Sequence, residues 1–330
     1  MSSAKSQEGK VPARIISVID TVLWEERDWE RLAQWGCILR HEGSPSTGEE
    51  VSRRVNGAHI VVVAEAIVSA EVIERCPELK MISLWSTGYD HVDVDAARCH
   101  GIVVCNVPDY AMHSVAEHAV AMALALAKRL PQADAHVRSG QFRWQAIRGM
   151  ELHRKTVGVV GTGAIGGKFA ALAKGFGCRV LATTLHPSPA RACTLGVEYV
   201  DLATLLRKSD VISLHVPLTL ATKGMLGRAE FELMEKQPIL INTARGGLID
   251  PEALLWALEE GRIRGAGLDV LWEEPPHPDD PLFQKLLAMD HVILSPHCAS
   301  NTPEAFRLLT DTCLDNIAHY LAGRPTNVVT

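Results

Sequence analysis

The sequence has 330 residues, which is long enough for two domains that each bury a hydrophobic core. Its 47% hydrophobic and 22% charged residues are ordinary for a globular cytoplasmic protein, and a net charge of −6 disfavours a nucleic-acid-binding surface. No apolar run approaches the ~20 residues of a membrane span, so a membrane partner is not expected. Residues 1–10 lack the apolar segment of a secretion signal and are expected to form a short disordered lead-in.

The cysteines and histidines show no metal-binding pattern. The eight cysteines form neither a Cys-x-x-Cys motif nor a regular framework, so we expect reduced thiols. His113 and His118 are five residues apart and therefore do not share a helix face, as an i, i+4 zinc pair would. The sequence predicts no metal site, and both histidines are interpreted as ordinary helix residues.

Strands alternate with helices along the chain, which is typical of parallel α/β architecture. Before residue 107, short apolar runs predict strands at 14–18, 59–63, 80–84 and 101–105, with helices at 29–34 and 70–76. These elements suffice for a small doubly wound sheet. None of them is followed by a glycine-rich loop that could hold a phosphate.

A long helix is predicted next, over residues 114–138, with a break near Pro131. One of its faces carries small apolar side chains, namely Val115, Ala119, Met122, Ala123 and Leu126. Because small side chains let another helix approach closely, this face could lie at a domain or subunit interface. Ordinary core packing is an equally good interpretation.

A second parallel sheet is predicted to begin at residues 157–160. Its further strands are expected at 180–183, 211–215, 239–242, 265–269 and 292–295. The last helix is expected to open with Asn301 and Thr302 as caps, to have Pro303 in its first turn, and to stop at Gly323.

The first strand of this second sheet runs into the sequence Gly-Thr-Gly-Ala-Ile-Gly and then into an amphipathic helix. Gly161 permits the tight turn, Gly163 lets a pyrophosphate approach the backbone, and Gly166 lets the helix pack on the strand. A pyrophosphate would then lie on the free N–H groups of the first helical turn, which contains Ala164 and Ile165. Between a strand and a helix, this motif predicts a dinucleotide cofactor.

Four polar residues lie at or just after the ends of three predicted strands of the second sheet. They are Arg245, Asp269, Glu274 and His297, and ligands of doubly wound sheets bind at this carboxyl edge. A planar guanidinium holds a substrate carboxylate at two points, and a histidine donates a proton near neutral pH. A carboxylate next to the histidine raises its pKa and fixes its tautomer. Together these residues suit the reduction of a 2-oxo acid.

The chain resembles the D-isomer-specific 2-hydroxyacid dehydrogenases, the family that includes glycerate (hydroxypyruvate) reductases and phosphoglycerate dehydrogenases. The resemblance runs from about residue 50 to the C-terminus and rests on several motifs in the same order. Besides the glycine motif they are STGYDHVD at 86–93, NVP at 106–108 with VAEH at 115–118, HVPLT at 215–219, TARGG at 243–247, residues 269–275, and SPH at 295–297.

The resemblance implies roles at the reacting centre. His297 would be the general acid/base with Glu274 as its partner, and Arg245 would bind the carboxylate and carbonyl of the substrate. The backbone N–H groups of Thr87 and Gly88 would hold the other side of the carboxylate.

The resemblance also implies the cofactor contacts and the domain organisation. Asp269 would hold the nicotinamide carboxamide, Thr243 and Ala244 would line the ring, and the segment with His215 and Pro217 would contribute to the same site. A Rossmann domain at 107–300 would be inserted in a discontinuous, flavodoxin-like substrate domain at 1–106 and 301–330. Closure of the domains would exclude water, and the family implies a homodimer built partly on the long helix.

The residue at the end of the second strand of the cofactor domain bears on the choice between NAD and NADP. Enzymes that prefer NAD usually have an acid there for the ribose 2′-hydroxyl, whereas this chain has Thr184 and no acid between residues 168 and 197. Without that negative charge, Thr184, His186 and Arg191 could hydrogen-bond a 2′-phosphate. The sequence therefore favours NADP, although loss of the acid could also simply relax selectivity.

The expected substrates are small 2-oxo acids such as glyoxylate and hydroxypyruvate. Phosphite-oxidising relatives carry a lysine where this chain has Thr87, so phosphite is disfavoured, and a phosphorylated hydroxy acid used with NAD is the less favoured alternative. A third alternative is a non-enzymatic nucleotide-sensing module like the related corepressors, although the chain lacks a long disordered tail for partner docking.

Overall fold

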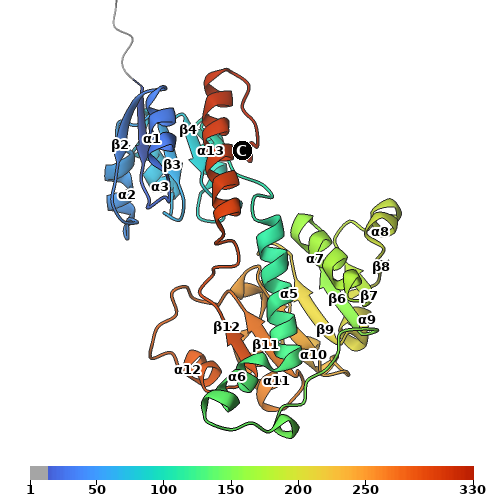
Figure 1. The fold of residues 1–330 in the computed structure, drawn as a ribbon. Coiled ribbons are helices and arrows are strands. Elements are labelled where there is room, and N and C mark those ends of the chain that lie inside the picture. Colours follow the sequence, from blue (N-terminus) through green and yellow to red (C-terminus); the bar gives the residue numbers. More distant parts are fainter. Residues whose placement is uncertain (1–13) are drawn as a thin grey trace, which may run out of the picture. The chain divides into compact units, whose positions relative to one another are not determined.

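The computed structural model describes residues 14–330, and these residues form two compact units (Figure 1). One unit contains residues 14–110 together with Thr302–Thr330, and the other consists of Ala111–Asn301. Each unit is an α/β fold built on a parallel sheet, which confirms the fold class predicted from the sequence. The lead-in expected at residues 1–10 lies outside the described residues.

The first unit contains a five-stranded sheet in the order β2-β1-β3-β4-β5, and every neighbouring pair is parallel. This is the flavodoxin-like strand order. Hydrophobic clusters lie on both faces of the sheet, which is why β3 is a continuous apolar run. The strands are β1 (Ile15–Val18), β2 (Cys37–Arg40), β3 (Ile60–Val63), β4 (Met81–Leu84) and β5 (Val103–Cys105).

Helix α13 (Pro303–Leu321) completes the core of the first unit, although it follows the whole second unit in the sequence. It lies beside β4 and α1 (Figure 1), and its buried face contributes Leu309, Cys313, Leu314 and Ile317 to the core. The other helices of this unit are α1 (Glu26–Ala33), α2 (Gly48–Val55), α3 (Ala70–Glu74) and α4 (Val94–Cys99).

The second unit contains a seven-stranded parallel sheet in the order β12-β11-β10-β9-β6-β7-β8. Six of these strands follow the Rossmann order, with β6 as the first strand and β12 added at one edge. The strands are β6 (Thr156–Val160), β7 (Arg179–Thr183), β8 (Glu198–Tyr199), β9 (Val211–Leu214), β10 (Ile239–Asn242), β11 (Gly265–Leu268) and β12 (Val292–Leu294).

Helices connect these parallel strands, as a parallel sheet requires. The connecting helices are α7 (Ala164–Gly175), α8 (Pro189–Leu195), α9 (Leu202–Lys208), α10 (Arg228–Glu232), α11 (Pro251–Glu259) and α12 (Pro281–Leu287). Helices α5 (Met112–Lys128) and α6 (Leu130–Arg138) precede β6, and short 3₁₀ turns lie at Trp144–Ala146 and Gly246–Leu248.

The long predicted helix consists of two helices, α5 and α6. The chain breaks at Arg129, whose φ of 54° is left-handed, and Pro131 then lies in the first turn of α6. The small apolar face of α5 is buried within its own unit, where it packs on α7 and β10. Of the two interpretations left open by the sequence, core packing is therefore the one that the structure shows for this face.

Strands β2 and β8 were not predicted, and in the first unit neither were helices α2 and α4. Strand β2 lies at an edge and is mostly exposed, so its sequence lacks an apolar run, and β8 has only two residues. Helices α2 and α4 are short, although the side chains of Thr47 and Asp93 cap them through the backbone N–H groups of Glu50 and Ala96. These caps were sequence signals that the prediction did not use.

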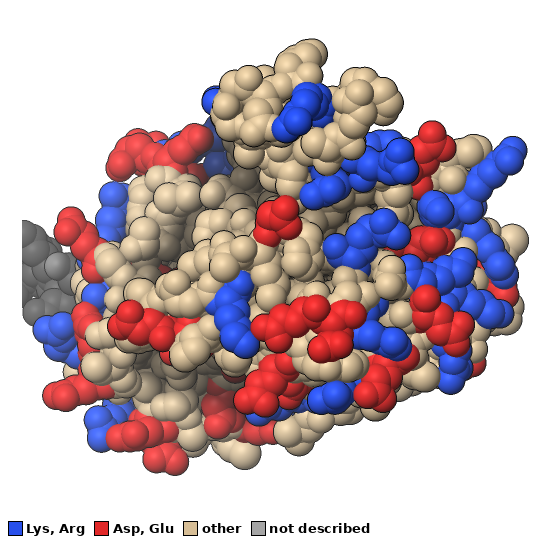
Figure 2. Space-filling model, turned by 90° about the horizontal axis from the view of Figure 1, so that it is seen from below, with Lys and Arg blue, Asp and Glu red and all other residues tan. Residues whose placement is uncertain are grey.

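All eight cysteines are free thiols, spread over both units. Among the helices of residues 14–330, none has both the length and the apolar character needed to cross a bilayer. On the face shown in Figure 2, the side chains of Lys and Arg are interspersed with those of Asp and Glu.

Candidate active site

The glycine loop joins β6 to α7 with the geometry that the motif predicts. Gly161 has a φ of +93°, and a Cβ atom there would lie 2.4 Å from the carbonyl oxygen of His215. A Cβ atom on Gly166 would lie 1.9 Å from the carbonyl oxygen of Gly161. Both positions therefore need glycine for the fold itself, because a side chain would collide with backbone.

Gly163 differs from these two glycines. It has a φ of −64°, and a Cβ atom there would meet no atom of the described residues within 4 Å. No side chain caps α7, whose first turn contains Ala164, Ile165 and Gly166, so its N–H groups are available to an anion. The space beside Gly163 and the uncapped helix fit a pyrophosphate.

Arg191 binds the glycine loop from α8. Its Nε and Nη2 atoms donate to the carbonyl oxygen of Thr162 at 2.8 and 2.5 Å, and Nη2 also donates to that of Gly163 at 3.1 Å. Thr184 directly follows β7 and is half-buried, while His186 is exposed. The sequence did not predict that Arg191 would support the glycine loop.

His215 lies directly after β9 and packs against Phe169, with the ring centroids 5.1 Å apart. Burial lowers the pKa of His215 to about 3, so the imidazole is neutral at physiological pH. Its Nε2 atom forms a 2.8 Å hydrogen bond with Oγ of Ser213. His215 therefore packs against the glycine loop and the helix that follows it. Pro217 lies two residues after His215, in an exposed segment.

The turn after β10 places Thr243, Ala244 and Arg245. Asn242 organises this turn, because its side chain accepts a hydrogen bond from the N–H of Ala244 and donates one to the carbonyl oxygen of Arg245. The Oγ1 atom of Thr243 is buried and has no hydrogen-bond partner among the described residues. Burying a hydroxyl without a hydrogen-bond partner costs free energy. The Thr243 hydroxyl therefore fits a site in which a bound polar ligand supplies the partner.

Asp269 follows β11 and is 1% exposed. Its carboxylate accepts hydrogen bonds from the backbone N–H groups of Cys298 and Ala299, both at 2.9 Å, and from Oγ of Ser295 at 2.5 Å. The backbone carbonyl of Asp269 accepts the N–H of His297 at 2.8 Å. Asp269 therefore fixes the loop that carries His297, a role that the sequence did not reveal.

His297 and Glu274 form a hydrogen-bonded pair, with 2.6 Å between Nδ1 and Oε2. This hydrogen bond raises the pKa of His297 above its ordinary value, against the opposing effect of burial, and the negative charge of Glu274 adds to the rise. Burial alone would raise the pKa of Glu274, but the hydrogen bonds from His297 and from the N–H of Leu271 bring it below its ordinary value. Both shifts favour the charged forms of the pair, imidazolium and carboxylate.

The positive charge of Arg245 acts on both members of this pair, lowering the pKa of Glu274 and opposing the rise at His297. Arg245 is therefore close enough for its charge to act on Glu274 and His297, although the three residues follow three different strands. His297 has a left-handed φ of 50°, which is unusual for a residue other than glycine and recurs where side chains are held for function.

Thr87 and Gly88 lie in the first unit, after β4. The side chain of Thr87 donates to the carbonyl oxygen of Val107 at 2.6 Å, and Asn106 Nδ2 donates to the carbonyl oxygen of Thr87 at 2.8 Å. The carbonyl oxygen of Gly88 accepts a hydrogen bond from Oγ of Ser86 at 2.8 Å. The side chain of Thr87 is thereby engaged, and the backbone of this loop is held in place.

Three residues beside Asp269 were not predicted as site residues, namely Ser295, Cys298 and His118, which the sequence analysis interpreted as an ordinary helix residue. His118 on α5 lies 3.1 Å from Oγ of Ser295 and 3.7 Å from Oδ1 of Asp269. His118 belongs to the VAEH motif and Ser295 to the SPH motif. Membership of these motifs was the one sequence signal that could have marked the two residues as part of the site.

The comparison with protein families agrees with this architecture. The family described as "D-isomer specific 2-hydroxyacid dehydrogenase, NAD binding domain" matches residues 120–299. The chain belongs to the D-isomer-specific 2-hydroxyacid dehydrogenase family and is an oxidoreductase with an NAD-binding Rossmann domain.

Several relatives are similar over most of the chain. Glycerate dehydrogenase of Methylorubrum extorquens is 39% identical over 86% of this chain and 89% of its own length. Glyoxylate reductase of Thermococcus litoralis is 41% identical over 82% of each chain. The structure of an acyclic imino acid reductase in complex with NADPH and D-Arg has a TM-score of 0.88 and 32% identity, covering 96% of this chain and 100% of its own.

The chain is also similar to longer proteins. D-3-phosphoglycerate dehydrogenase of Archaeoglobus fulgidus is 41% identical over 84% of this chain. This chain spans only about half, 52%, of the length of that relative.

Proposed function

We propose that the protein reduces a small 2-oxo acid to the D-2-hydroxy acid with NAD(P)H, and that His297 is the general acid. The observation that carries this proposal is the 2.6 Å hydrogen bond between His297 and Glu274, with the charge of Arg245 acting on both. When bound, the reduced nicotinamide supplies the hydride that adds to the carbonyl carbon.

The proton comes from His297. Glu274 occupies Nδ1, so Nε2 is the ring atom left to transfer a proton to the carbonyl oxygen. As the hydride adds to carbon, the carbonyl π electrons move to oxygen, which takes the Nε2 proton. His297 becomes neutral and regains a proton from solvent, and in the oxidative direction the same nitrogen accepts the proton from the hydroxyl.

The substrate carboxylate is bound by Arg245. A guanidinium presents two parallel N–H donors to a carboxylate, which fixes the orientation of the 2-oxo group as well as its charge. We assign the backbone N–H groups of Thr87 and Gly88 in the first unit to the other side of the carboxylate.

The proposed domain boundaries are a substrate domain at 1–106 with 301–330 and a cofactor domain at 107–300.

The second unit offers a set of cofactor contacts at the carboxyl edge of its sheet. Gly161, Gly163 and the first turn of α7 are assigned to the pyrophosphate, and Thr243, Ala244 and Asp269 to the nicotinamide end. The unpartnered hydroxyl of Thr243 and the open space beside Gly163 support these assignments. His215 and Pro217 are assigned to the same site.

We propose NADP rather than NAD as the preferred cofactor. Thr184 follows β7 where an acid would repel a 2′-phosphate, and Arg191 brings a positive charge to the neighbouring glycine loop. The relative that was crystallised with NADPH is consistent with this choice.

Glyoxylate and hydroxypyruvate are the substrates that we propose. Relatives named glyoxylate reductase and glycerate dehydrogenase are 41% and 39% identical to this chain over most of its length, which supports this choice. Thr87 also provides no positive charge for a phosphate or phosphite dianion.

The test is a spectrophotometric assay of a panel of 2-oxo acids, including glyoxylate, hydroxypyruvate and pyruvate, with NADH and NADPH in parallel and with a metal chelator present. We expect turnover of at least one unphosphorylated 2-oxo acid, faster with NADPH. Absence of turnover with every acid, combined with tight cofactor binding, would favour a nucleotide-sensing module instead.

We further propose a homodimer that uses the segment following α5. Leu130, Val137, Phe142 and Trp144 are large apolar residues on this segment, and Phe142 and Trp144 are 90% and 79% exposed. Sedimentation analysis should show a dimer that Trp144→Glu dissociates, whereas the control Leu220→Glu, at a 99% exposed position elsewhere, should leave it intact. A monomeric wild-type protein would overturn this assignment.

A further inference from the structure

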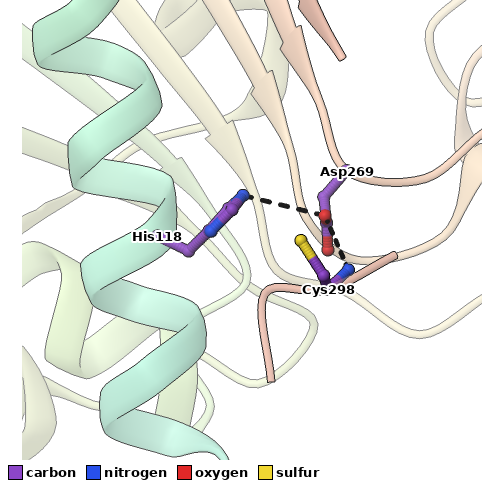
Figure 3. A group of neighbouring side chains, drawn as sticks. All are labelled: His118, Asp269 and Cys298. Atoms are coloured by element: carbon purple, nitrogen blue, oxygen red, sulfur yellow. Dashed lines mark hydrogen bonds and ion pairs between the residues drawn. The ribbon is translucent and has the colours of Figure 1, made fainter. Parts of the chain in front are cut away.

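Three potential metal ligands meet at the carboxyl edge of the second unit's sheet. His118 comes from α5, Asp269 follows β11, and Cys298 follows β12 (Figure 3). One ligand atom from each residue lies within 4.8 Å of the other two, and His118 Nε2 is 3.7 Å from Asp269 Oδ1. In residues 14–330 this is the one group of three histidine, cysteine or acidic side chains that meets this spacing.

The spacing and the donor atoms fit a zinc ion. Zinc takes imidazole nitrogen, carboxylate oxygen and thiolate sulfur at about 2.0–2.3 Å in a tetrahedron, so its ligand atoms lie roughly 3.5 Å apart. Three protein ligands would leave the fourth position open to water. A mixed nitrogen, oxygen and sulfur set also favours zinc over magnesium or calcium, which prefer oxygen ligands alone.

The surroundings of Asp269 are those of an oriented ligand. The backbone N–H groups of Cys298 and Ala299 donate to its two oxygens, which holds the carboxylate in one orientation. Cys298 thus contributes twice: its backbone N–H holds the carboxylate of Asp269, and its sulfur is one of the three ligand atoms. Two contacts of Ser295 would have to give way, namely the 3.1 Å contact with His118 and the 2.5 Å hydrogen bond to Oδ1 of Asp269. The zinc–ligand bonds would replace them.

We propose that His118, Asp269 and Cys298 bind Zn²⁺, and that the ion and the nicotinamide end of the cofactor exclude each other because both use Asp269. The site follows from the geometry alone, whereas the exclusion rests on the proposed function. Binding forms a zinc–sulfur bond as the thiol proton passes to solvent, and no change of oxidation state is involved. The bound ion would act as an inhibitor rather than as a participant in hydride transfer.

Zinc binding is tested without cofactor, on protein that has no histidine tag and has been treated with a chelator. Competition with a chromophoric chelator should give one Zn²⁺ per chain, and Co²⁺ should give the near-ultraviolet sulfur-to-metal charge-transfer band of a thiolate ligand. Cys298→Ser should abolish this band and weaken Zn²⁺ binding at least about tenfold. Cys193→Ser, which removes an exposed thiol from α8, should change neither.

Binding that is identical in wild type and Cys298→Ser would overturn the site. His118→Gln provides a second variant, because glutamine keeps a polar side chain on α5 but removes the imidazole ligand. It should weaken Zn²⁺ binding similarly while far-ultraviolet circular dichroism remains that of the wild type. Retained affinity in this variant would remove His118 from the ligand set.

The exclusion is tested by repeating the Zn²⁺ titration at increasing NADPH. We expect the apparent dissociation constant for Zn²⁺ to rise in proportion to NADPH once the cofactor exceeds its own dissociation constant. Inhibition of 2-oxo acid reduction by Zn²⁺ should be competitive with cofactor and should need at least about tenfold more Zn²⁺ in Cys298→Ser. A Zn²⁺ affinity that NADPH leaves unchanged would overturn the exclusion.

These outcomes separate the site from the proposed function. Binding that depends on Cys298, without turnover of any 2-oxo acid in chelator, would support the zinc site and overturn the enzymatic proposal. Turnover in chelator without binding that depends on Cys298 would do the reverse.

Discussion

Nδ1 of His297 donates a 2.6 Å hydrogen bond to one oxygen of Glu274, and the other oxygen of that carboxylate accepts the backbone N–H of Leu271 at 2.9 Å. Glu274 is therefore held between the imidazole and the chain that follows β11. Its position is fixed by the fold, and it can set both the ring orientation and the protonation state of His297.

Replacing His297 by asparagine should lower kcat by about 10²–10⁴, the usual contribution of a general acid/base. The dissociation constant for NADPH, measured by fluorescence, should stay within about twofold, because His297 is not assigned to the cofactor. An unchanged kcat would remove His297 from the mechanism.

The pH dependence of reduction should shift in Glu274→Gln. Reduction needs protonated His297, so kcat/KM should fall as pH rises through the pKa of this residue, which Glu274 raises. Without that carboxylate the pKa drops, and the fall should occur at lower pH. The profile should be measured in chelator, and identical profiles for variant and wild type would show that the pairing does not operate in catalysis.

Arg245→Lys tests the two-point grip on the carboxylate. Lysine keeps the charge but loses the planar pair of donors, and a charged hydrogen bond contributes about 1.5–3 kcal/mol. We expect kcat/KM for the 2-oxo acid to fall about 10- to 100-fold, while NADPH affinity is unchanged. Equal activity in the two proteins would place the carboxylate elsewhere.

Two glycines of one loop should respond differently to alanine. Gly166→Ala places a Cβ atom 1.9 Å from the carbonyl oxygen of Gly161, so we expect a loss of about 1–3 kcal/mol in stability, measured by denaturant unfolding. Gly163→Ala meets no described atom within 4 Å, so its stability should be nearly unchanged while cofactor affinity falls. Normal cofactor affinity in Gly163→Ala would move the pyrophosphate away from this residue.

Thr184→Asp tests the cofactor preference. An acid at the end of β7 would repel a 2′-phosphate and could accept a hydrogen bond from a ribose 2′-hydroxyl. The ratio of kcat/KM with NADPH to that with NADH should fall at least about tenfold, with Thr194→Asp on the exposed part of α8 as a control. An unchanged ratio would show that Thr184 does not face the ribose.

The sequence was sufficient to predict the fold class and most strands of both sheets, because buried parallel strands are continuous apolar runs. It was sufficient to recognise the family because several motifs occur in the same order. It placed Arg245, Glu274 and His297 at one sheet edge, and in the structure the charge of Arg245 acts on the other two. The edge strands β2 and β8 were missed because exposed or very short strands carry little apolar signal.

The contacts of Asp269 could not be predicted from the sequence for a different reason. Its partners are mainly backbone N–H groups, which every residue except proline has, so no side-chain pattern marks them. Spacing along the sequence likewise relates His118 only to His113 on the same helix. Its neighbours in space come from segments more than a hundred residues further along the chain.

The order of the chain has a consequence for synthesis on the ribosome. The core of the first unit contains Leu309, Leu314 and Ile317 from α13, which is translated only after the whole second unit. Until then the nascent first unit lacks the part of its core that α13 supplies. The Rossmann domain is synthesised in this interval and can fold before the first unit is complete.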